Sequence, residues 1–132
     1  MREVLEIKNN KIIIPSYFDD LYKTNISAIV SFDKKKISIV NESEIEKYAN
    51  QVNNYFNLLL STHKISYRKY LSYKRYYFSK LYFYLNQINS KRELLLPKKA
   101  LDMVGIEKTL FLSNENSHLE IYKSEQDYKL SL

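Results

Sequence analysis

The chain has 132 residues, the usual length of one domain, and its 45% hydrophobic and 27% charged residues are typical of a globular rather than a disordered protein. It contains no cysteine, which excludes disulfides and thiolate metal sites. No apolar run approaches the roughly 20 residues of a membrane span, and the first residues lack the apolar core of a secretory signal. We therefore expect a cytoplasmic protein that does not contact membranes.

The net charge of +6 is unevenly distributed. Residues 61–99 contain ten basic residues and one acid, Glu93, so this segment carries +9 and the remainder of the chain carries −3. Such asymmetry favours a polyanionic partner, nucleic acid before membrane because no apolar face accompanies the charge. The alternative is a basic face that is simply solvated. The ten cations are Lys64, Arg68, Lys69, Lys74, Arg75, Lys80, Lys91, Arg92, Lys98 and Lys99.

Residues 3–7 and 11–14 are predicted to form the strands of a hairpin. Lys8, Asn9 and Asn10 separate the two apolar runs, and asparagine tolerates the positive φ of a tight turn. Pro15 then ends the pairing because it has no N–H. A short helix is expected at residues 16–22, followed by a second hairpin, residues 28–32 and 36–40, around the turn at 33–35.

Two longer helices are expected next. Apolar side chains recur every three or four residues between Ile45 and Leu59, behind the candidate N-caps Asn41 and Ser43, which predicts an amphipathic packing helix. The second helix, residues 66–80, interleaves aromatic and cationic side chains. Such a helix either stacks bases and binds phosphates, or buries its tyrosines against a partner helix and leaves its cations in water.

The remaining chain repeats the first part at a constant offset of 82 residues. The triplet before Pro15 corresponds to the triplet before Pro97, and residues 29–31, 37 and 39 correspond to 111–113, 119 and 121. Strands are predicted at 82–87, 93–96, 109–113 and 118–122, with a short helix at 98–104 that ends at Gly105. The order β-β-α-β-β therefore occurs twice, and duplicated units usually bury their apolar faces against each other.

These repeats resemble the MraZ family, bacterial cell-division-cluster regulators with two AbrB-type swapped-hairpin repeats. Residues 11–15, Lys-Ile-Ile-Ile-Pro, are similar to the family's Arg-Leu-x-Ile-Pro, and residues 44–48 to its acidic helix start. Residues 75–78 resemble its Arg-Phe-Leu-Leu stretch. Residues 94–97, followed by Leu101, Gly105 and Ile106, resemble its Ile-Pro-x-x-Leu and Ala-Gly-Leu landmarks.

The resemblance implies an α+β fold in which two tandem β-β-α-β-β swapped-hairpin repeats form a small β-barrel with a connecting helical pair. We expect a first repeat at residues 1–48, the helical connection at 49–81 and a second repeat at 82–128, all in one compact body. The family's Asp-x-x-x-Arg motif crosses each hairpin turn, and here those positions hold Ile7 and Lys11, then Asn89 and Glu93. Lys11 can neutralise a phosphate but lacks the bidentate fork of arginine. The resemblance places DNA contacts on the two turns, at Lys8, Asn9, Asn10, Lys11, Asn89, Lys91 and Arg92.

The expected function is DNA-binding transcription regulation at the nucleoid by a ring-like homo-oligomer that contacts short promoter repeats. The alternative is a diverged oligomeric scaffold or interaction protein that has lost specific DNA binding. We expect no enzymatic activity, cofactor, metal or small-molecule ligand, because no nucleophile with a base, glycine-rich phosphate loop or metal cluster is recognisable. His63 and His118 are each expected to be isolated surface or loop residues.

Overall fold

The structure is a computed structural model that describes residues 2–15, 25–85, 88–115 and 118–132. Its mixture of helices and mostly antiparallel strands confirms the expected α+β class. The short helix expected at residues 16–22 lies outside the described residues. Within the described ranges, no helix is both long enough and apolar enough to cross a membrane.

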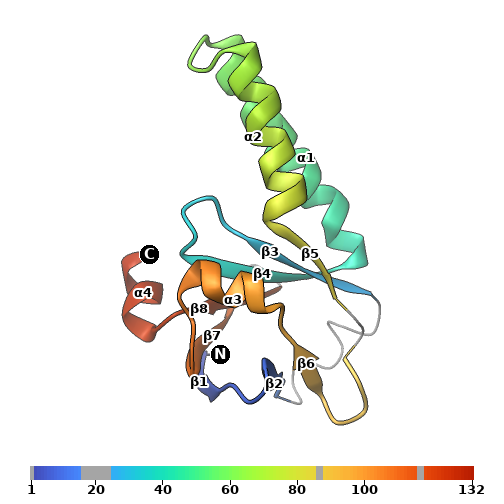
Figure 1. Cartoon of the computed structure of the whole chain (residues 1–132), viewed down its shortest axis with the longest axis vertical. Coiled ribbons are helices and arrows are strands. Elements are labelled where there is room, and N and C mark those ends of the chain that lie inside the picture. Colours follow the sequence, from blue (N-terminus) through green and yellow to red (C-terminus); the bar gives the residue numbers. More distant parts are fainter. Residues whose placement is uncertain (1, 16–24, 86–87, 116–117) are drawn as a thin grey trace.

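The described strands form two antiparallel sheets (Figure 1). The larger sheet has six strands in the order β1-β7-β8-β4-β3-β5, and the smaller sheet pairs β2 with β6. The described strands therefore do not close into the expected barrel by continuous hydrogen bonding. The strands β1 and β5 remain the edges of the larger sheet. The strands are β1 (Arg2–Glu6), β2 (Lys11–Ile13), β3 (Ile26–Val30), β4 (Lys36–Asn41), β5 (Tyr82–Leu85), β6 (Glu93–Leu95), β7 (Thr109–Glu115) and β8 (His118–Tyr122).

The helices begin and end at local signals in the sequence. The Asn41 side chain accepts a hydrogen bond from the backbone N–H of Glu44 at 3.1 Å and so caps α1 (Glu42–Ser61). Ser66 caps α2 (Tyr67–Lys80) in the same way, through the N–H of Lys69 at 3.2 Å. Both long helices were predicted from the sequence, and the structure confirms them.

The sequence predicted one of the two short helices but not the other. The predicted helix α3 (Lys98–Val104) ends at Gly105, whose φ of +81° lies in the left-handed region that glycine adopts readily. The helix α4 (Glu125–Leu130) was not predicted, because six residues are too few to show an apolar stripe. It is capped by Ser124 and fixed by the buried Tyr128, which packs against the rings of Phe111 and Tyr122.

Equivalent strands of the two repeated segments pair with each other. Ile12 lies opposite Leu94 in the β2–β6 pair, and Ser38 lies opposite Glu120 in the β4–β8 pair. Both pairs join positions that are 82 residues apart, the offset of the repeat. In addition, β1 pairs with β7 and β5 pairs with β3, so the first strand of each segment lies beside the third strand of the other. The two segments therefore share one fold related by an approximate two-fold axis.

The exchange of strands shows that the first hairpin was predicted wrongly. Residues 3–7 and 11–14 were predicted to pair as strands, but only one bridge, between Lys8 and Lys11, joins them. The chain separates after the turn because β2 instead pairs with β6 and buries Ile12 and Ile14 among the apolar side chains of the core. Likewise, β5 and β6 flank a turn without pairing with each other. The other two predicted hairpins, β3–β4 and β7–β8, are confirmed.

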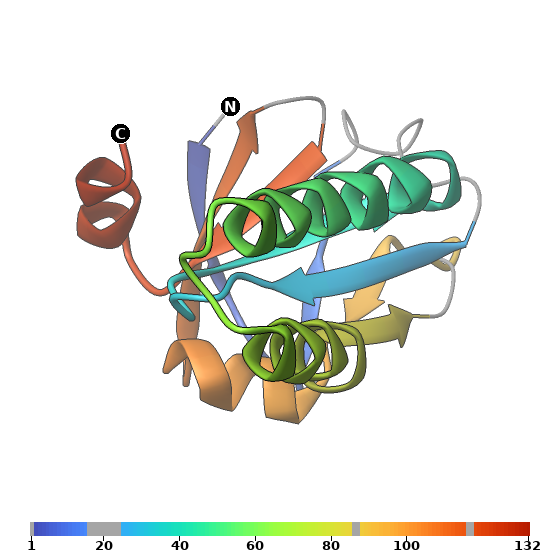
Figure 2. The same cartoon turned by 90° about the horizontal axis from the view of Figure 1, so that it is seen from above.

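The helices α1 and α2 form an antiparallel pair that projects from the sheet (Figure 1), and seen from above α1 lies over the sheet, roughly along β4 and beside β3 (Figure 2). The base of this pair joins the core through Tyr76 and Tyr77 of α2 and through Ile45, Tyr48 and Val52 of α1. Toward the tip, large side chains remain exposed, among them Leu58 at 59% and Tyr67 at 63%. The helical pair therefore offers apolar surface that one subunit leaves uncovered.

The β2–β6 pair allows a matched test of the exchanged core. Ile12 is 1% exposed and Ile13, its neighbour, is 53% exposed. We predict that Ile12→Ala lowers the free energy of unfolding by about 3 kcal/mol, because it leaves a cavity between the two segments. Ile13→Ala should cost less than about 1 kcal/mol. Chemical denaturation of both variants checks this, and equal costs would contradict the strand exchange.

Candidate functional site

The first hairpin turn is tight and exposed. Backbone hydrogen bonds join Lys8 N to Lys11 O at 3.1 Å and Lys11 N to Lys8 O at 2.9 Å. Asn9 and Asn10 have φ values of +52° and +63°, as a two-residue hairpin turn of this hand requires. Lys8, Asn9 and Lys11 are exposed, and Asn10 is half-buried. This turn therefore presents the predicted cations to solvent.

The second turn is built around Asn89. Its side-chain oxygen accepts hydrogen bonds from the backbone N–H groups of Lys91 and Glu93, each at 3.0 Å. Its backbone oxygen accepts from Arg92 N at 2.9 Å. Asn89, predicted as a DNA contact, thus has a structural task in the turn, while Lys91 and Arg92 remain exposed.

The two turns lie at opposite ends of the β2–β6 pair and are held by equivalent bonds. Leu96 N donates to Asn10 O at 2.7 Å, and Ile14 N donates to Arg92 O at 2.8 Å. Asn10 and Arg92 are separated by the repeat offset and both have positive φ, +63° and +58°. The approximate two-fold axis therefore extends to the turns.

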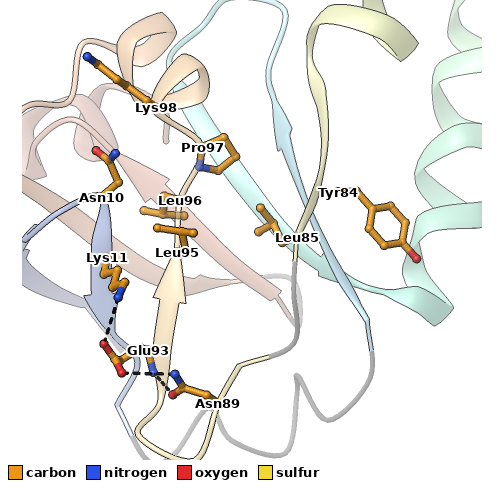
Figure 3. A pocket seen from close by; sticks show the side chains of 10 residues that line it. All are labelled: Asn10, Lys11, Tyr84, Leu85, Asn89, Glu93, Leu95, Leu96, Pro97 and Lys98. Carbon is orange, nitrogen blue, oxygen red and sulfur yellow. Dashed lines mark hydrogen bonds and ion pairs between the residues drawn. The ribbon is translucent and has the colours of Figure 1, made fainter.

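Between the turns, Lys11 meets Glu93 (Figure 3). The Lys11 Nζ lies 3.8 Å from a Glu93 carboxylate oxygen, and Asn89 Nδ2 donates to the other oxygen at 3.3 Å. Asn10, Lys11 and Asn89 share a hollow of about 540 Å³ with Glu93, whereas Lys8, Asn9, Lys91 and Arg92 lie outside its lining. The cation expected to meet DNA in the first segment thus has an intramolecular acidic partner.

The exposed face of the β2–β6 pair carries two apolar side chains beside the Lys11–Glu93 contact. Ile13 and Leu95 are 53% and 51% exposed and lie opposite Glu93 and Lys11, respectively. Two uncovered aliphatic side chains beside a neutralised ion pair are not typical of a phosphate-binding surface. The cations suited to DNA are therefore the exposed Lys8, Lys91 and Arg92 on the turns, whereas Lys11 is held by Glu93.

The basic segment is divided between two places. Lys91, Arg92, Lys98 and Lys99 lie on the second turn and on α3, and the other six cations lie on α2 or just before it. In α2, Tyr77 is buried and Tyr70 donates a hydrogen bond to Asn57 of α1 at 2.6 Å. Tyr77 packs in the core with residues of the sheet, and Tyr67 and Tyr73 remain exposed, so the predicted packing of tyrosines against the partner helix holds only in part.

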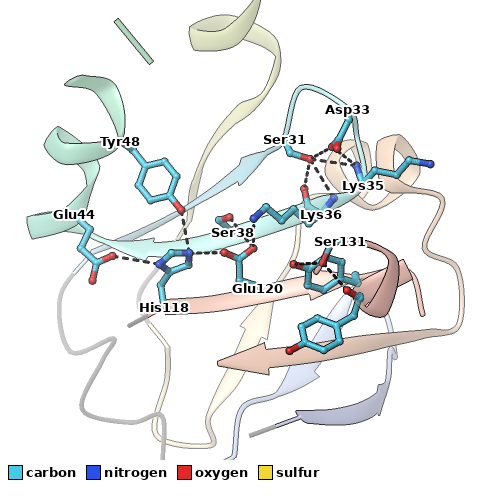
Figure 4. Close-up of polar contacts among 12 residues, drawn as sticks. Ser31, Asp33, Lys35, Lys36, Ser38, Glu44, Tyr48, His118, Glu120 and Ser131 are labelled. Atoms are coloured by element: carbon cyan, nitrogen blue, oxygen red, sulfur yellow. Dashed lines mark hydrogen bonds and ion pairs between the residues drawn. The ribbon is translucent and has the colours of Figure 1, made fainter. Parts of the chain in front are cut away.

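Sequence reasoning missed a buried polar cluster beneath α1 (Figure 4). His118, expected to be an isolated surface or loop residue, is only 6% exposed. Its Nε2 lies 2.8 Å from Glu120 Oε1 and 3.0 Å from the Tyr48 hydroxyl, and its Nδ1 lies 3.7 Å from Glu44. That prediction was wrong because strand β8 lies in the middle of the sheet, where α1 covers it. His63 is exposed, as expected.

Glu120 is the centre of this cluster. Lys36 Nζ lies 3.0 Å from Glu120 Oε2, and Ser38 donates to the same oxygen at 3.4 Å. Burial alone would raise the pKa of the Glu120 carboxyl, but the hydrogen bonds from His118 and Lys36 outweigh burial and hold the pKa below its ordinary value. Burial alone would lower the pKa of Lys36, and the hydrogen bond and charge of Glu120 raise it overall. The pair is therefore ionised over a wide pH range.

The cluster contains one histidine and two carboxylates, His118, Glu120 and Glu44, but they are not arranged as metal ligands. Across the part of the chain that the structure describes, no group of three or more His, Cys, Asp or Glu side chains is arranged to hold a metal ion. Burial raises the pKa of Tyr48 in the cluster, and it raises the pKa of Tyr77 at the base of the helical pair to about 12, so both hydroxyls stay protonated at neutral pH.

Compared with models of known protein families and with curated protein sequences, the chain matches none.

The cluster predicts a pH-dependent stability. Glu120→Gln should lower the free energy of unfolding near neutral pH by about 3 kcal/mol, because it removes one partner of a buried ion pair. A carboxyl whose pKa is lowered by folding stabilises fully above its unfolded pKa, near 4.5, and this contribution is lost as the pH falls through the lower native value. The deficit of Glu120→Gln should therefore shrink in acid.

Chemical denaturation at several pH values measures this deficit. Glu125→Gln is the matched control, because Glu125 is exposed in α4 and its ion pair is with the exposed Lys129, four residues away. This substitution should cost less than about 0.5 kcal/mol. A deficit for Glu120→Gln that stays constant down to about pH 3 would show that folding does not lower the pKa of this carboxyl.

Proposed function

We propose that this chain is a DNA-binding transcriptional regulator of the MraZ type, with two tandem swapped-hairpin repeats. The observation that carries the proposal is the exchange of strands between the repeated segments: β1 lies on β7, β5 on β3 and β2 on β6. This is the pairing that interleaved hairpins require. It supports the finer fold assignment independently of the motifs near Pro15 and Pro97.

DNA would be contacted through the two hairpin turns. Lys8, Lys91 and Arg92 are exposed on them, and both turns are fixed by backbone or asparagine hydrogen bonds, so their cations are presented on a rigid support. Each subunit would make few phosphate contacts. Several subunits bound to successive promoter repeats would raise the overall affinity by about 10² to 10⁴-fold without stronger individual contacts.

A homo-oligomer, expected to be ring-like, would supply this multivalency. The exposed Tyr55, Leu58 and Tyr67 on the projecting helical pair support association, because one subunit leaves them uncovered. Such a regulator would act in the cytoplasm at the nucleoid.

A second candidate is a diverged oligomeric scaffold that no longer binds DNA specifically. The Lys11–Glu93 contact at 3.8 Å favours it, because the position expected to carry an arginine in the second segment holds an acid that neutralises Lys11. The exposed Ile13 and Leu95 on the same face suit a protein contact better than a phosphate contact.

Two variants with the same loss of charge test the proposal. Lys91 lies on the second turn, and Lys64 lies in the connection between α1 and α2, at the tip of the helical pair (Figure 1). We predict that Lys91→Ala weakens binding to duplex DNA that carries the short repeats of its own promoter. It should also reduce the magnitude of the slope of log K against log salt by about 0.9, while Lys64→Ala changes neither.

Fluorescence anisotropy at several salt concentrations measures both quantities, and competition with excess unrelated duplex tests specificity. Equal effects of the two variants on DNA affinity would show that the DNA contact is not specific to the turns. Binding that unrelated duplex abolishes, or no binding at all, would favour the scaffold.

A further inference from the structure

The tip of the helical pair carries positive charge without an acid beside it. Lys64, Arg68 and Lys69 are exposed there, in the turn that joins α1 to α2 and in the first turn of α2. The sequence contains no acidic residue between Glu46 and Glu93, and the acids of α1 lie in its first turns, at the base of the pair. The charge of the tip therefore favours a negatively charged partner.

Apolar side chains accompany this charge. Leu58, Tyr67 and Leu71 are 59%, 63% and 44% exposed, and they lie in the last turn of α1 and the first two turns of α2. The sequence favoured nucleic acid over a membrane because no apolar face accompanied the basic segment. The fold supplies such a face at the tip, where the end of α1 lies beside the start of α2.

Backbone hydrogen bonds fix the shape of the tip. His63 N donates to Leu60 O at 3.1 Å and Lys64 N donates to Leu59 O at 2.9 Å, which is the bond pattern of a Schellman C-cap. His63 has the positive φ, +60°, that this cap requires. The exposed side chains are therefore held on a rigid support at the end of the helical pair that is farthest from the sheet (Figure 1).

A lipid surface suits this combination better than nucleic acid. Base stacking needs flat rings, but two of the three apolar side chains are leucines, and Tyr67 already stacks on Tyr70 with ring centroids 6.0 Å apart. Duplex DNA offers phosphates but no apolar layer for leucine. At an anionic bilayer, cations meet the headgroup phosphates while leucine and tyrosine enter the boundary with the acyl chains.

A second copy of the chain is a poorer occupant of the tip. Two tips brought together would place like charges side by side, which is unfavourable. The subunit contact proposed above can instead use the sides of the helical pair, where Tyr55 is exposed. Association of subunits would then leave the tips uncovered.

We propose that the tip of the helical pair binds the surface of an anionic lipid bilayer, with Lys64 and Arg68 at the headgroup phosphates and Leu58 and Tyr67 in the apolar boundary. This contact does not depend on DNA binding. The hairpin turns lie at the opposite end of the molecule (Figure 1), so a subunit that binds DNA through them would hold that DNA at a membrane surface.

Sedimentation of the full chain with lipid vesicles tests the proposal. At physiological salt, vesicles of phosphatidylcholine and phosphatidylglycerol in equal parts should bind the protein at least about tenfold more tightly than vesicles of phosphatidylcholine alone, because only the mixed vesicles are charged. No binding to the mixed vesicles, or equal binding to both kinds, would overturn the proposal.

A fluorescent reporter locates the contact. The chain contains no tryptophan, so Tyr67→Trp places a single one at the tip, and the mixed vesicles should shift its emission to shorter wavelength as the ring leaves water. Tyr84→Trp is the matched control, because Tyr84 is 67% exposed on the edge strand β5, away from the tip, and its emission should not change.

Three outcomes of the reporter experiment would contradict the proposal. Equal shifts at both positions would show that the tip is not the contact. Emission of Tyr67→Trp that is already at short wavelength without vesicles would show that a second copy covers the tip. A shift caused by a single-stranded oligonucleotide but not by the mixed vesicles would make nucleic acid the occupant.

Paired substitutions test the phosphate contacts. Lys64→Gln combined with Arg68→Gln removes two charges from the tip and should weaken binding to the mixed vesicles at least about tenfold. Lys98→Gln combined with Lys99→Gln removes the same charge from exposed positions of α3 and should leave the affinity unchanged. Thermal unfolding confirms that each variant is folded. Equal losses would show that the chain adsorbs through its overall charge and not through the tip.

Discussion

The pairing of each repeated segment with its own counterpart is the constraint on which the structure depends. Two pairs of equivalent positions, Ile12 with Leu94 and Ser38 with Glu120, face each other on the approximate two-fold axis. Because each first strand lies on the third strand of the other segment, neither segment can complete its sheet alone. The core, the hairpin turns and the polar cluster all follow from this arrangement.

A two-fold axis brings equivalent residues close together, so the two copies cannot carry the same charge near it without repulsion. The chain shows opposite or neutral partners at these positions. Lys11 corresponds to Glu93 and forms an ion pair with it, and Glu120 corresponds to Ser38, which donates a hydrogen bond to it. Lys36 corresponds to His118, and both contact Glu120. Divergence between the copies has thus placed attractive contacts along the axis.

Local signals predicted much of the fold. Asn41 and Gly105 marked helix ends because capping and the left-handed conformation depend on neighbouring residues. The hydrophobic pattern located the strands but misassigned the partners of β1 and β2, since alternation indicates which face is buried and not which strand lies alongside.

The hairpin turns and the polar cluster also differ in how far the sequence could predict them. The turns could be predicted from Asn9 and Asn10 and from the clustered cations, because turn chemistry is local. The Lys11–Glu93 contact and the cluster around His118 could not, because their members are brought together only by the strand exchange. Tyr48 is 70 residues from His118, and Ser38 is 82 residues from Glu120. The repeat offset was the one signal that could have placed Ser38 beside Glu120.

The central claim is that the turns and their cations face DNA, with Glu93 weakening the contact by holding Lys11. The most direct measurement is the salt dependence of DNA affinity for Glu93→Gln, alone and combined with Lys11→Ala. If the claim holds, Glu93→Gln frees Lys11, tightens binding and steepens the slope of log K against log salt by about 0.9, and the double variant loses this gain. An affinity and slope that Glu93→Gln leaves unchanged would contradict it.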